Sequence, residues 1–439
     1  MKSIKAPLLA LAMGVALSVQ SGVARAQAAE QYIPLLSFRI GFSATTGTGF
    51  FGGIIDYLNI VNAKGGINGV KMVWEECETE FIVSRGVECY ERVKTRNGGA
   101  SLIEPLSTGI TYALLGKTRE DKIPLTTLGY GRSDAADGRV FPYVFPLVTN
   151  YLNQTAGIIR FIGEKSGGMD KLKGKRIAYL YMDAAFGYEP IPVLQAEAKK
   201  HGFELIMVPV TPPGTEQNSQ WLRLRRENPD YVVMWPTGVM TPTALKTAAR
   251  NGYPSDRIIG SWWGGSEEEV VPAGEAGKGY ISAGFTTPGN YPLLDEIRKL
   301  YAAGKGDLKE QGRIGSAYHT RGVVAGILMT EAIASAQRKF GVGKRMTPEQ
   351  VRWGIENLNI DDKRQQELGV SGLFPTVKTS CLDHEGSGAI KMQQWDGAKW
   401  VSITPNWIVG DKALTRKLIE ESAAKYAAEN KITPVSCPN

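Results

Sequence analysis

The chain has 439 residues, of which 43% are hydrophobic and 22% charged, and it contains 51 glycines and 23 prolines. These fractions exclude a disordered, collagen-like or polytopic membrane protein, and the length favours two domains of ordinary size. Four cysteines are too few for a small disulfide-rich protein whose fold depends on its disulfides. Three histidines, His201, His319 and His384, offer little for a histidine-rich metal site or a Ser-His relay.

Residues 1–26 have the three parts of a secretory signal peptide. Lys2 and Lys5 form a basic start, an apolar run follows over 8–19, and Ala24-Arg25-Ala26 supplies a cleavage pattern. The apolar run is shorter than the roughly 20 residues that cross a bilayer, which argues against a membrane anchor. No cysteine near the cleavage site offers a lipid attachment point. We therefore expect an exported protein without a lipid anchor.

Removal of this segment takes away three positive charges and no acid, so the net charge falls from +7 to +4. An excess that small, spread over a large surface, does not indicate a nucleic-acid partner.

The four cysteines form two candidate pairs in an oxidising compartment. A Cys77–Cys89 disulfide would join the end of a strand to the next helix, and Cys381–Cys437 would hold down a C-terminal tail. Spacing proves neither pairing, and free buried thiols are the alternative. No C-x-x-C motif occurs, so nothing indicates redox catalysis.

Short apolar strands alternate with amphipathic helices from residue 38 onward, which predicts a parallel sheet with helices on both faces. In the first round the predicted strands are 38–42, 70–76, 100–104 and 123–128, and the predicted helices are 51–62, 83–94 and 111–119.

A second round repeats the alternation without an obvious sequence repeat. Its predicted strands are 176–181, 203–208, 231–235 and 257–260, and its predicted helices are 193–201, 221–227 and 243–251. Between the rounds, the two prolines of Phe141–Pro146 suit an extended crossing segment. The rest of the chain predicts helices at 293–303, 316–336 and 414–429, and a hairpin of strands 388–395 and 399–403 around Asp396-Gly397.

This order predicts an α/β fold of two Rossmann-like lobes, each with a parallel sheet, joined by several crossings of the chain. We assign residues 37–146 and 288–371 to lobe 1. Residues 147–287 and 372–439, with the hairpin and the last helix, are assigned to lobe 2.

Residues 47–52, Gly-Thr-Gly-Phe-Phe-Gly, satisfy the G-x-G-x-x-G pattern of dinucleotide binding. However, the predicted strand ends near Phe42, so the loop at 43–46 is too long for the tight turn of that motif. An exported protein also meets little free NAD. Glycines that let a loop approach a ligand, or that only permit a turn, are the better interpretation. Phe50 is then a candidate ligand contact, and no cofactor is expected.

Hydroxyl and polar side chains follow two neighbouring strands of the first round. Ser107 and Thr108 begin a helix, where hydroxyls and unpaired backbone N–H groups bind carboxylates; simple N-capping is the alternative. Gly129, Tyr130 and Arg132 follow the next strand. The guanidinium of Arg132 could bind a carboxylate through two N–H groups, and a solvated surface arginine is the alternative.

Aromatic side chains follow the strands of the second round at matching positions. They are Phe186, Trp235 and the Trp262-Trp263 pair. Ligands bind outside the carboxyl ends of parallel strands, and loops there are seldom core, so these residues predict a shared aromatic-lined cleft.

Catalytic and metal-binding patterns are weak. No G-x-S-x-G or H-E-x-x-H motif occurs. Asp383-His384-Glu385 is better interpreted as a polar turn than as a metal site, because adjacent residues seldom point at one ion. The Glu267-Glu268-Glu269 run is expected to be a solvated helix start. We expect neither an enzyme nor a metal site.

The signal, the twin lobes and the loop placement together resemble the periplasmic Leu/Ile/Val-binding protein family, the type I substrate-binding proteins of ABC importers. The resemblance covers nearly the whole chain after the signal. Its most specific segments are Asn62–Gly69 and Ile390–Gly397, with the loop at 105–111 and Phe186-Gly187 beside them.

The resemblance implies that the loop with Ser107 and Thr108 holds a ligand carboxylate, with help from the 129–132 loop, and that Phe186 covers the ligand. It also implies that an acidic residue in a late loop of lobe 2 binds the amino group of the ligand. Here that loop is Trp262–Gly265, and the first acid comes at Glu267. The departure favours an aromatic or other hydrophobic organic acid over an α-amino acid.

We therefore expect a monomeric periplasmic protein that closes around a small carboxylate-bearing ligand, an amino acid or a hydrophobic acid, and delivers it to an ABC permease. Tyr130, Phe186, Trp235 and Trp263 would sandwich the ligand body, with Arg132 as counter-charge. A ligand-sensing component of a signalling system is the alternative, and an exported enzyme is a more distant one.

Overall fold

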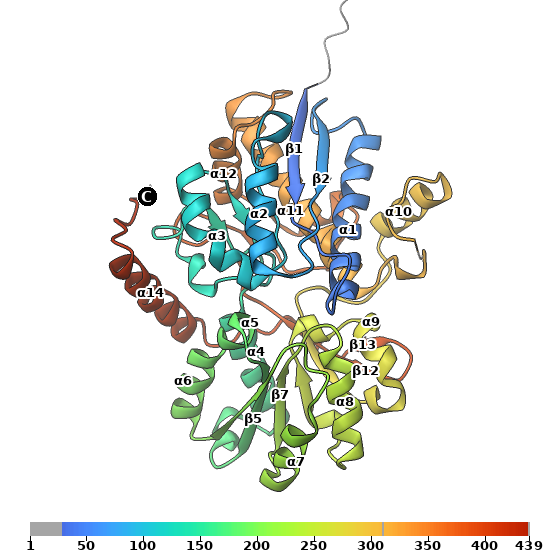
Figure 1. Cartoon of the computed structure of the whole chain (residues 1–439), viewed down its shortest axis with the longest axis vertical. Coiled ribbons are helices and arrows are strands. Elements are labelled where there is room, and N and C mark those ends of the chain that lie inside the picture. The colour runs from blue at the N-terminus through green and yellow to red at the C-terminus, as the bar shows by residue number, and fades with distance from the viewer. Residues whose placement is uncertain (1–28, 310, 438–439) are drawn as a thin grey trace, which may run out of the picture.

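The computed structural model describes residues 29–309 and 311–437 and shows two α/β lobes, one above the other in the view of Figure 1. The predicted signal peptide, residues 1–26, lies outside the described residues. Within the described ranges, no helix has both the length and the apolar character that crossing a bilayer requires.

Lobe 1 is built on short parallel strands. β1 (Glu30–Leu35) pairs with β2 (Lys71–Glu76), and β3 (Leu125–Thr126) pairs with β4 (Val144–Phe145). Single bridges, Leu35 to Glu104 and Ile103 to Leu125, connect the two pairs. The lobe also contains α1 (Ala44–Ala63), α2 (Val83–Val93), α3 (Thr108–Asp121), α10 (Pro292–Ala302), α11 (Ala317–Phe340), α12 (Pro348–Glu356), β10 (Asn359–Ile360), α13 (Asp362–Glu367) and β11 (Val377–Lys378).

Lobe 2 contains a seven-stranded sheet in the order β13-β12-β9-β8-β7-β5-β6, in which the five strands from β9 to β6 are parallel and the β12–β13 hairpin is antiparallel. The strands are β5 (Arg176–Met182), β6 (Glu204–Val210), β7 (Tyr231–Trp235), β8 (Ile258–Gly260), β9 (Ile281–Gly284), β12 (Lys391–Trp395) and β13 (Trp400–Ser402). The helices are α4 (Tyr151–Lys165), α5 (Ala185–Tyr188), α6 (Ile191–His201), α7 (Asn218–Glu227), α8 (Met240–Arg250) and α9 (Glu267–Val270).

The chain passes between the lobes after β4, after β9 and before β12. Lobe 1 therefore extends beyond residue 371, where it was expected to end, because β11 pairs with β10. These crossings are tied to one another, because Val148 N–H donates to the carbonyl of Glu385 and Thr287 N–H donates to that of Leu373, each at 2.8 Å. The expected two-lobed α/β fold is therefore present.

The last helix, α14 (Lys412–Glu429), packs against residues 133–136 of lobe 1 and against α4 and α6 of lobe 2. Both candidate disulfides are formed, Cys77–Cys89 and Cys381–Cys437.

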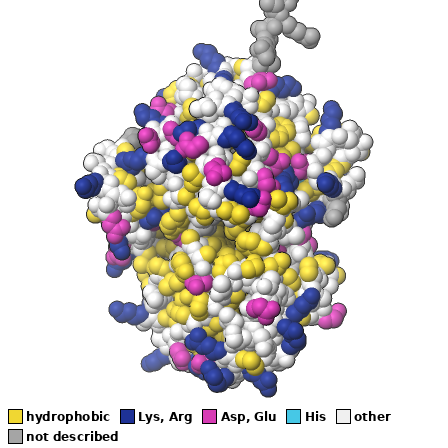
Figure 2. Space-filling model, viewed as in Figure 1, with side chains coloured by type: hydrophobic (Ala, Val, Ile, Leu, Met, Phe, Trp, Pro, Cys, Tyr) yellow, Lys and Arg dark blue, Asp and Glu magenta, His cyan; other side chains and the backbone are white. Residues whose placement is uncertain are grey.

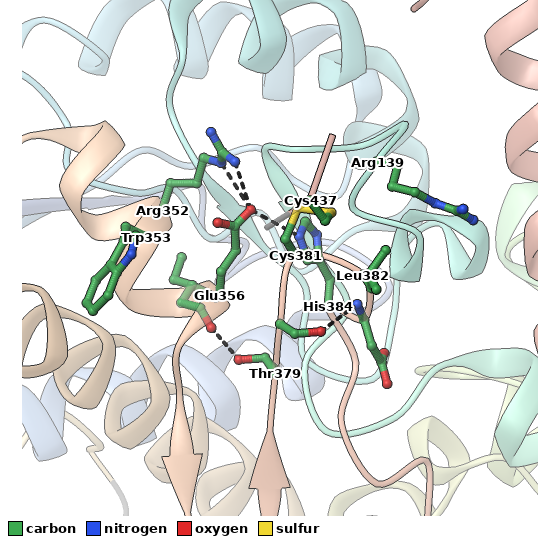
Figure 3. Close-up of polar contacts among 12 residues, drawn as sticks. Arg139, Arg352, Trp353, Glu356, Thr379, Cys381, Leu382, His384 and Cys437 are labelled. Atoms are coloured by element: carbon green, nitrogen blue, oxygen red, sulfur yellow. Dashed lines mark hydrogen bonds and ion pairs between the residues drawn. A yellow bond between two sulfur atoms is a disulfide. The ribbon is translucent and has the colours of Figure 1, made fainter. Parts of the chain in front are cut away.

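The tail disulfide lies beside a buried polar cluster (Figure 3). His384 is fully buried, with Nδ1 2.9 Å from the carbonyl oxygen of Val144 and Nε2 3.6 Å from Glu356. Glu356 also pairs with Arg352 at 2.9 Å. These contacts join α12 to the segment that leads back to lobe 2.

Two local predictions were wrong. The first strand is β1 at Glu30–Leu35, and residues 38–42 form an irregular segment that leads into α1. The glycines of 47–52 lie inside α1, so they form neither a dinucleotide turn nor a ligand loop. They allow close helix packing: a Cβ on Gly49 would lie 2.6 Å from Cβ of Tyr318 in α11.

Candidate ligand site between the lobes

A small cavity lies between the lobes, where hydrophobic side chains gather along the waist of the molecule (Figure 2). Its volume is about 30 Å³. Its lining comes from both lobes: Phe38, Ser43, Thr46, Phe81, Leu106, Thr108 and Tyr130 from lobe 1, and Tyr151, Phe186, Thr237 and Trp263 from lobe 2.

Ser107 and Thr108 begin α3, as predicted, but their hydroxyls have different surroundings. The Ser107 hydroxyl accepts from the N–H of Ile110 at 3.4 Å and caps the helix. Thr108 lines the cavity, and its hydroxyl accepts from the N–H of Gly131 at 3.3 Å. The N–H groups of Thr108 and Gly109 have no acceptor among the described residues, so the helix start remains available to an anion.

The next loop fixes the position of Tyr130. Its ring lines the cavity, while its hydroxyl donates to the fully buried Glu104 and accepts from the N–H of Leu106 at 2.7 Å. Burial raises the pKa of Glu104 to about 8.

The carbonyl of Gly129 accepts across the lobe boundary from the indole N–H groups of Trp262 and Trp263, at 2.8 and 3.3 Å. Glycine is needed at this position because φ is +67° and a Cβ would lie 2.6 Å from the ring of Phe285.

The aromatic wall has two layers. Phe186, Trp263 and Tyr151 line the cavity, and the indole N–H of Trp263 also donates to the Tyr151 hydroxyl at 3.0 Å. Trp235 and Phe50 are fully buried behind them, with ring centroids 5.6 Å from Tyr151 and 6.2 Å from Trp263 respectively. The aromatic residues after the strands thus converge, with Trp235 and Phe50 as support.

Arg132 lies away from the cavity. Its guanidinium forms a two-point ion pair with Asp134, at 2.6 and 2.9 Å, and stacks over Tyr426 of α14 at 4.3 Å from the ring centroid. The structure therefore brings Thr108, Tyr130, Phe186 and Trp263 to the cavity and leaves the hydroxyl of Ser107 and the charge of Arg132 outside its lining.

The acidic run of α9 is not a solvated helix start, contrary to the prediction. Glu269 is fully buried between the lobes and accepts from Tyr318 of α11 at 2.6 Å and from the N–H of Gly238 at 2.5 Å. Burial raises the pKa of Glu269 to about 7. Glu268 binds Arg313 at 3.1 Å and the Ser316 hydroxyl at 2.7 Å. Only the fold could reveal this role, because the start of α11 is distant in sequence.

Arg321 of α11 was not predicted as a site residue. It is 1% exposed, donates to the carbonyls of Trp262 and Gly265 in lobe 2, and stands 5.7 Å from the ring centroid of Trp263. Burial lowers its pKa to about 10. Its guanidinium thus holds the tryptophan loop of lobe 2 against lobe 1.

No cluster of three or more metal-ligating side chains occurs among residues 29–309 and 311–437. The cavity therefore offers binding through hydroxyls, helix-start N–H groups and aromatic faces.

Comparison with known proteins matches this geometry. A family model described as periplasmic binding protein covers residues 30–399. A solved structure from the Pseudomonas fluorescens group, described as an ABC transporter permease, is 45% identical, covers 93% of this chain and 99% of that chain, and gives a TM-score of 0.87. No curated protein matches the chain.

Two more distant structures show the fold alone. A branched-chain amino acid ABC transporter protein from Thermus thermophilus with bound valine is 20% identical over 89% of this chain and 98% of that chain, with a TM-score of 0.74. An ABC transporter solute-binding protein from R. palustris in complex with benzoate is 18% identical over 88% of this chain and 98% of that chain, with a TM-score of 0.67. The chain therefore belongs to the periplasmic binding protein family and has the type I fold of the Leu/Ile/Val-binding proteins, which are exported substrate-binding components of ABC transporters and work with their permeases.

Proposed function

We propose that this protein captures a small carboxylate-bearing ligand, an amino acid or a hydrophobic organic acid, and delivers it to the permease of an ABC importer. The observation that carries the proposal is the cavity between the lobes, where Thr108 and the free N–H groups at the start of α3 face aromatic rings from lobe 2. The neighbours with bound valine and bound benzoate both hold carboxylates, which supports the same ligand chemistry here.

Thr108 and the helix-start N–H groups would hold the carboxylate, and the cap of Ser107 keeps that turn in place. Tyr130, Phe186 and Trp263 would cover the ligand body. Because these groups belong to different lobes, a ligand that touches both stabilises the closed form over the open one. We further propose that the protein acts as a periplasmic monomer without a lipid anchor and releases its ligand chemically unchanged.

A thermal-shift screen of carboxylates tests the proposal. A ligand at about 100 times its dissociation constant adds roughly 2.7 kcal/mol to the free energy of unfolding and visibly raises the melting temperature. If no carboxylate raises the melting temperature, while an uncharged or cationic solute does, the proposal is wrong.

A further inference from the structure

The carboxylate of Glu269 lies next to the cavity, but its oxygens already accept hydrogen bonds from protein donors. Its Oε1 accepts from Gly238 N–H at 2.5 Å, from the Tyr318 hydroxyl at 2.6 Å and from the Thr46 hydroxyl at 3.4 Å, and its Oε2 accepts from Thr241. Glu269 thus receives three donors at Oε1 and one at Oε2, whereas each carboxylate oxygen offers two lone pairs. It is not among the residues that line the cavity.

Glu104, the buried acid on the lobe 1 side, is engaged in the same way. It accepts from the Tyr130 hydroxyl, from Leu106 N–H at 3.2 Å and from the Thr126 hydroxyl at 3.1 Å. Tyr130 presents its ring to the cavity and uses its hydroxyl on Glu104. Neither acid lines the cavity, so neither carboxylate faces a ligand ammonium directly.

The described residues that line the cavity carry no charge. Their polar side-chain groups are the indole N–H of Trp263 and the hydroxyls of Ser43, Thr46, Thr108, Thr237, Tyr130 and Tyr151. The hydroxyls of Ser43 and Thr237 lie 3.1 Å apart and bond to each other. Behind the aromatic wall, the buried charge beside Trp263 is the Arg321 cation, which forms no ion pair with any described carboxylate. A buried ammonium here would lose its hydration without meeting a charged side chain of the lining, whereas a carboxylate can accept from the N–H groups at the start of α3.

We infer that the cavity selects monocarboxylates that lack an α-amino group and carry a compact aromatic or branched aliphatic body. This inference rests on the proposed function and narrows it from carboxylates in general to one class. The aromatic lining and the small volume set the compact, apolar body, and the lining offers no carboxylate to a ligand ammonium.

Calorimetric titration of the mature, signal-free protein with matched pairs tests the selectivity. The pairs are 3-phenylpropanoate with phenylalanine and 3-methylbutanoate with valine, which differ only in the amino group. We expect at least one acid to bind about thirtyfold or more tightly than its amino acid, because an unpaired buried polar group costs about 1–3 kcal/mol and a charged one more. Equal or tighter binding of both amino acids would overturn the inference and leave the proposed function standing.

A comparison of benzoate with benzamide separates the inference about selectivity from the proposed function. Benzoate and benzamide share their shape, but only benzoate carries the charge. If benzamide binds as tightly as benzoate, or if no carboxylate binds, the proposed function itself fails, and the inference falls with it.

Glu269→Gln provides an internal control, because a defect in lobe closure weakens both members of a pair alike. Displacement of a bound acid by excess amino acid gives the affinity ratio even for a weak competitor. An unchanged ratio in this variant supports the inference. Selective loss of the amino acid would show that Glu269 does reach the ligand, and would overturn it.

Discussion

At the start of α3, two adjacent hydroxyl residues are expected to respond differently to substitution. Ser107→Ala removes the cap on Ile110 N–H and should lower the free energy of unfolding by about 1 kcal/mol. Thr108→Val keeps the side-chain volume but removes the hydroxyl that lines the cavity, so ligand affinity should fall by about 1–3 kcal/mol. Denaturant unfolding and calorimetry of both variants measure the two effects. The reverse assignment, with Ser107→Ala losing more affinity than Thr108→Val, would contradict these roles.

Buried carboxyls should make stability depend on pH in a direction opposite to that of ordinary ion pairs. Burial raises the pKa of Glu104 and Glu385 from 4.5 to about 8, and that of Glu269 to about 7. Between pH 4.5, the pKa of these carboxyls in the unfolded chain, and pH 7 to 8, their pKa in the folded protein, the folded state binds more protons than the unfolded chain. The stability from these groups is fully present below pH 4.5 and is lost as pH rises through 7 to 8.

The measurement is the melting temperature from pH 5 to 8.5 for the native protein and for Glu104→Gln. Each such group contributes a slope of at most about 1.4 kcal/mol per pH unit, so the native protein should lose stability more steeply than the variant over this range. Identical slopes would show that Glu104 ionises normally in the folded protein.

At the scale of single elements, the contact of α1 with α11 depends on glycine. A Cβ on Gly53 would lie 2.1 Å from the carbonyl oxygen of His319, so Gly53→Ala forces the two helices apart. We expect a loss of about 1–3 kcal/mol in the free energy of unfolding. Gly116 of α3 is the matched control, since nothing lies within 4 Å of its added Cβ. Gly116→Ala should stabilise by about 0.5–1 kcal/mol, and equal effects of the two variants in urea unfolding would refute the packing argument.

The two disulfides close loops of different length and should differ in their effect. Cys77–Cys89 spans 12 residues, whereas Cys381–Cys437 spans 56 and contains α14. In the chain-entropy account, the longer loop stabilises by about 1 kcal/mol more, within a typical total of about 2–4 kcal/mol. Paired Cys→Ser variants, compared by denaturant unfolding, measure the difference. A larger loss from the Cys77/Cys89 variant would mean that local contacts, and not loop closure, set the contribution.

The sequence predicted the alternation of elements well, because buried parallel strands and amphipathic helices leave strong local patterns. It failed where a segment's partner is distant. Residues 38–42 alternate like a strand, but only Phe38 among them lines the cavity and Ile40 is exposed, so the segment was mistaken for a strand. The acids of α9 face the start of α11, and Arg132 stacks under α14, so neither environment is visible locally. In the site, the loops were found from sequence, whereas Arg321 and Glu269 required the fold.

On the scale of the whole molecule, the closed arrangement is held by contacts made directly between the lobes. Glu267 accepts from the N–H of Ala317 at 2.9 Å, at the start of α11, and Glu189 of lobe 2 accepts from the N–H of Ser133 in lobe 1 at the same distance. Carboxylates at helix starts are favourable because of the helix dipole. These contacts lie outside the cavity lining, so we expect them to affect closure in the same way for every ligand.

Glu268→Gln tests this tuning. The substitution removes the charge that Arg313 binds at 3.1 Å and weakens the acceptor for Ser316, without touching the cavity lining. Apparent affinity is the intrinsic affinity multiplied by the fraction of molecules in the competent form, so destabilising the closed form by about 1 kcal/mol should weaken every ligand by the same factor, up to about fivefold. Small-angle scattering without ligand should show a larger radius of gyration than in the native protein, and saturating ligand should remove the difference. An unchanged radius together with a loss for some ligands only would place Glu268 in ligand recognition instead of closure.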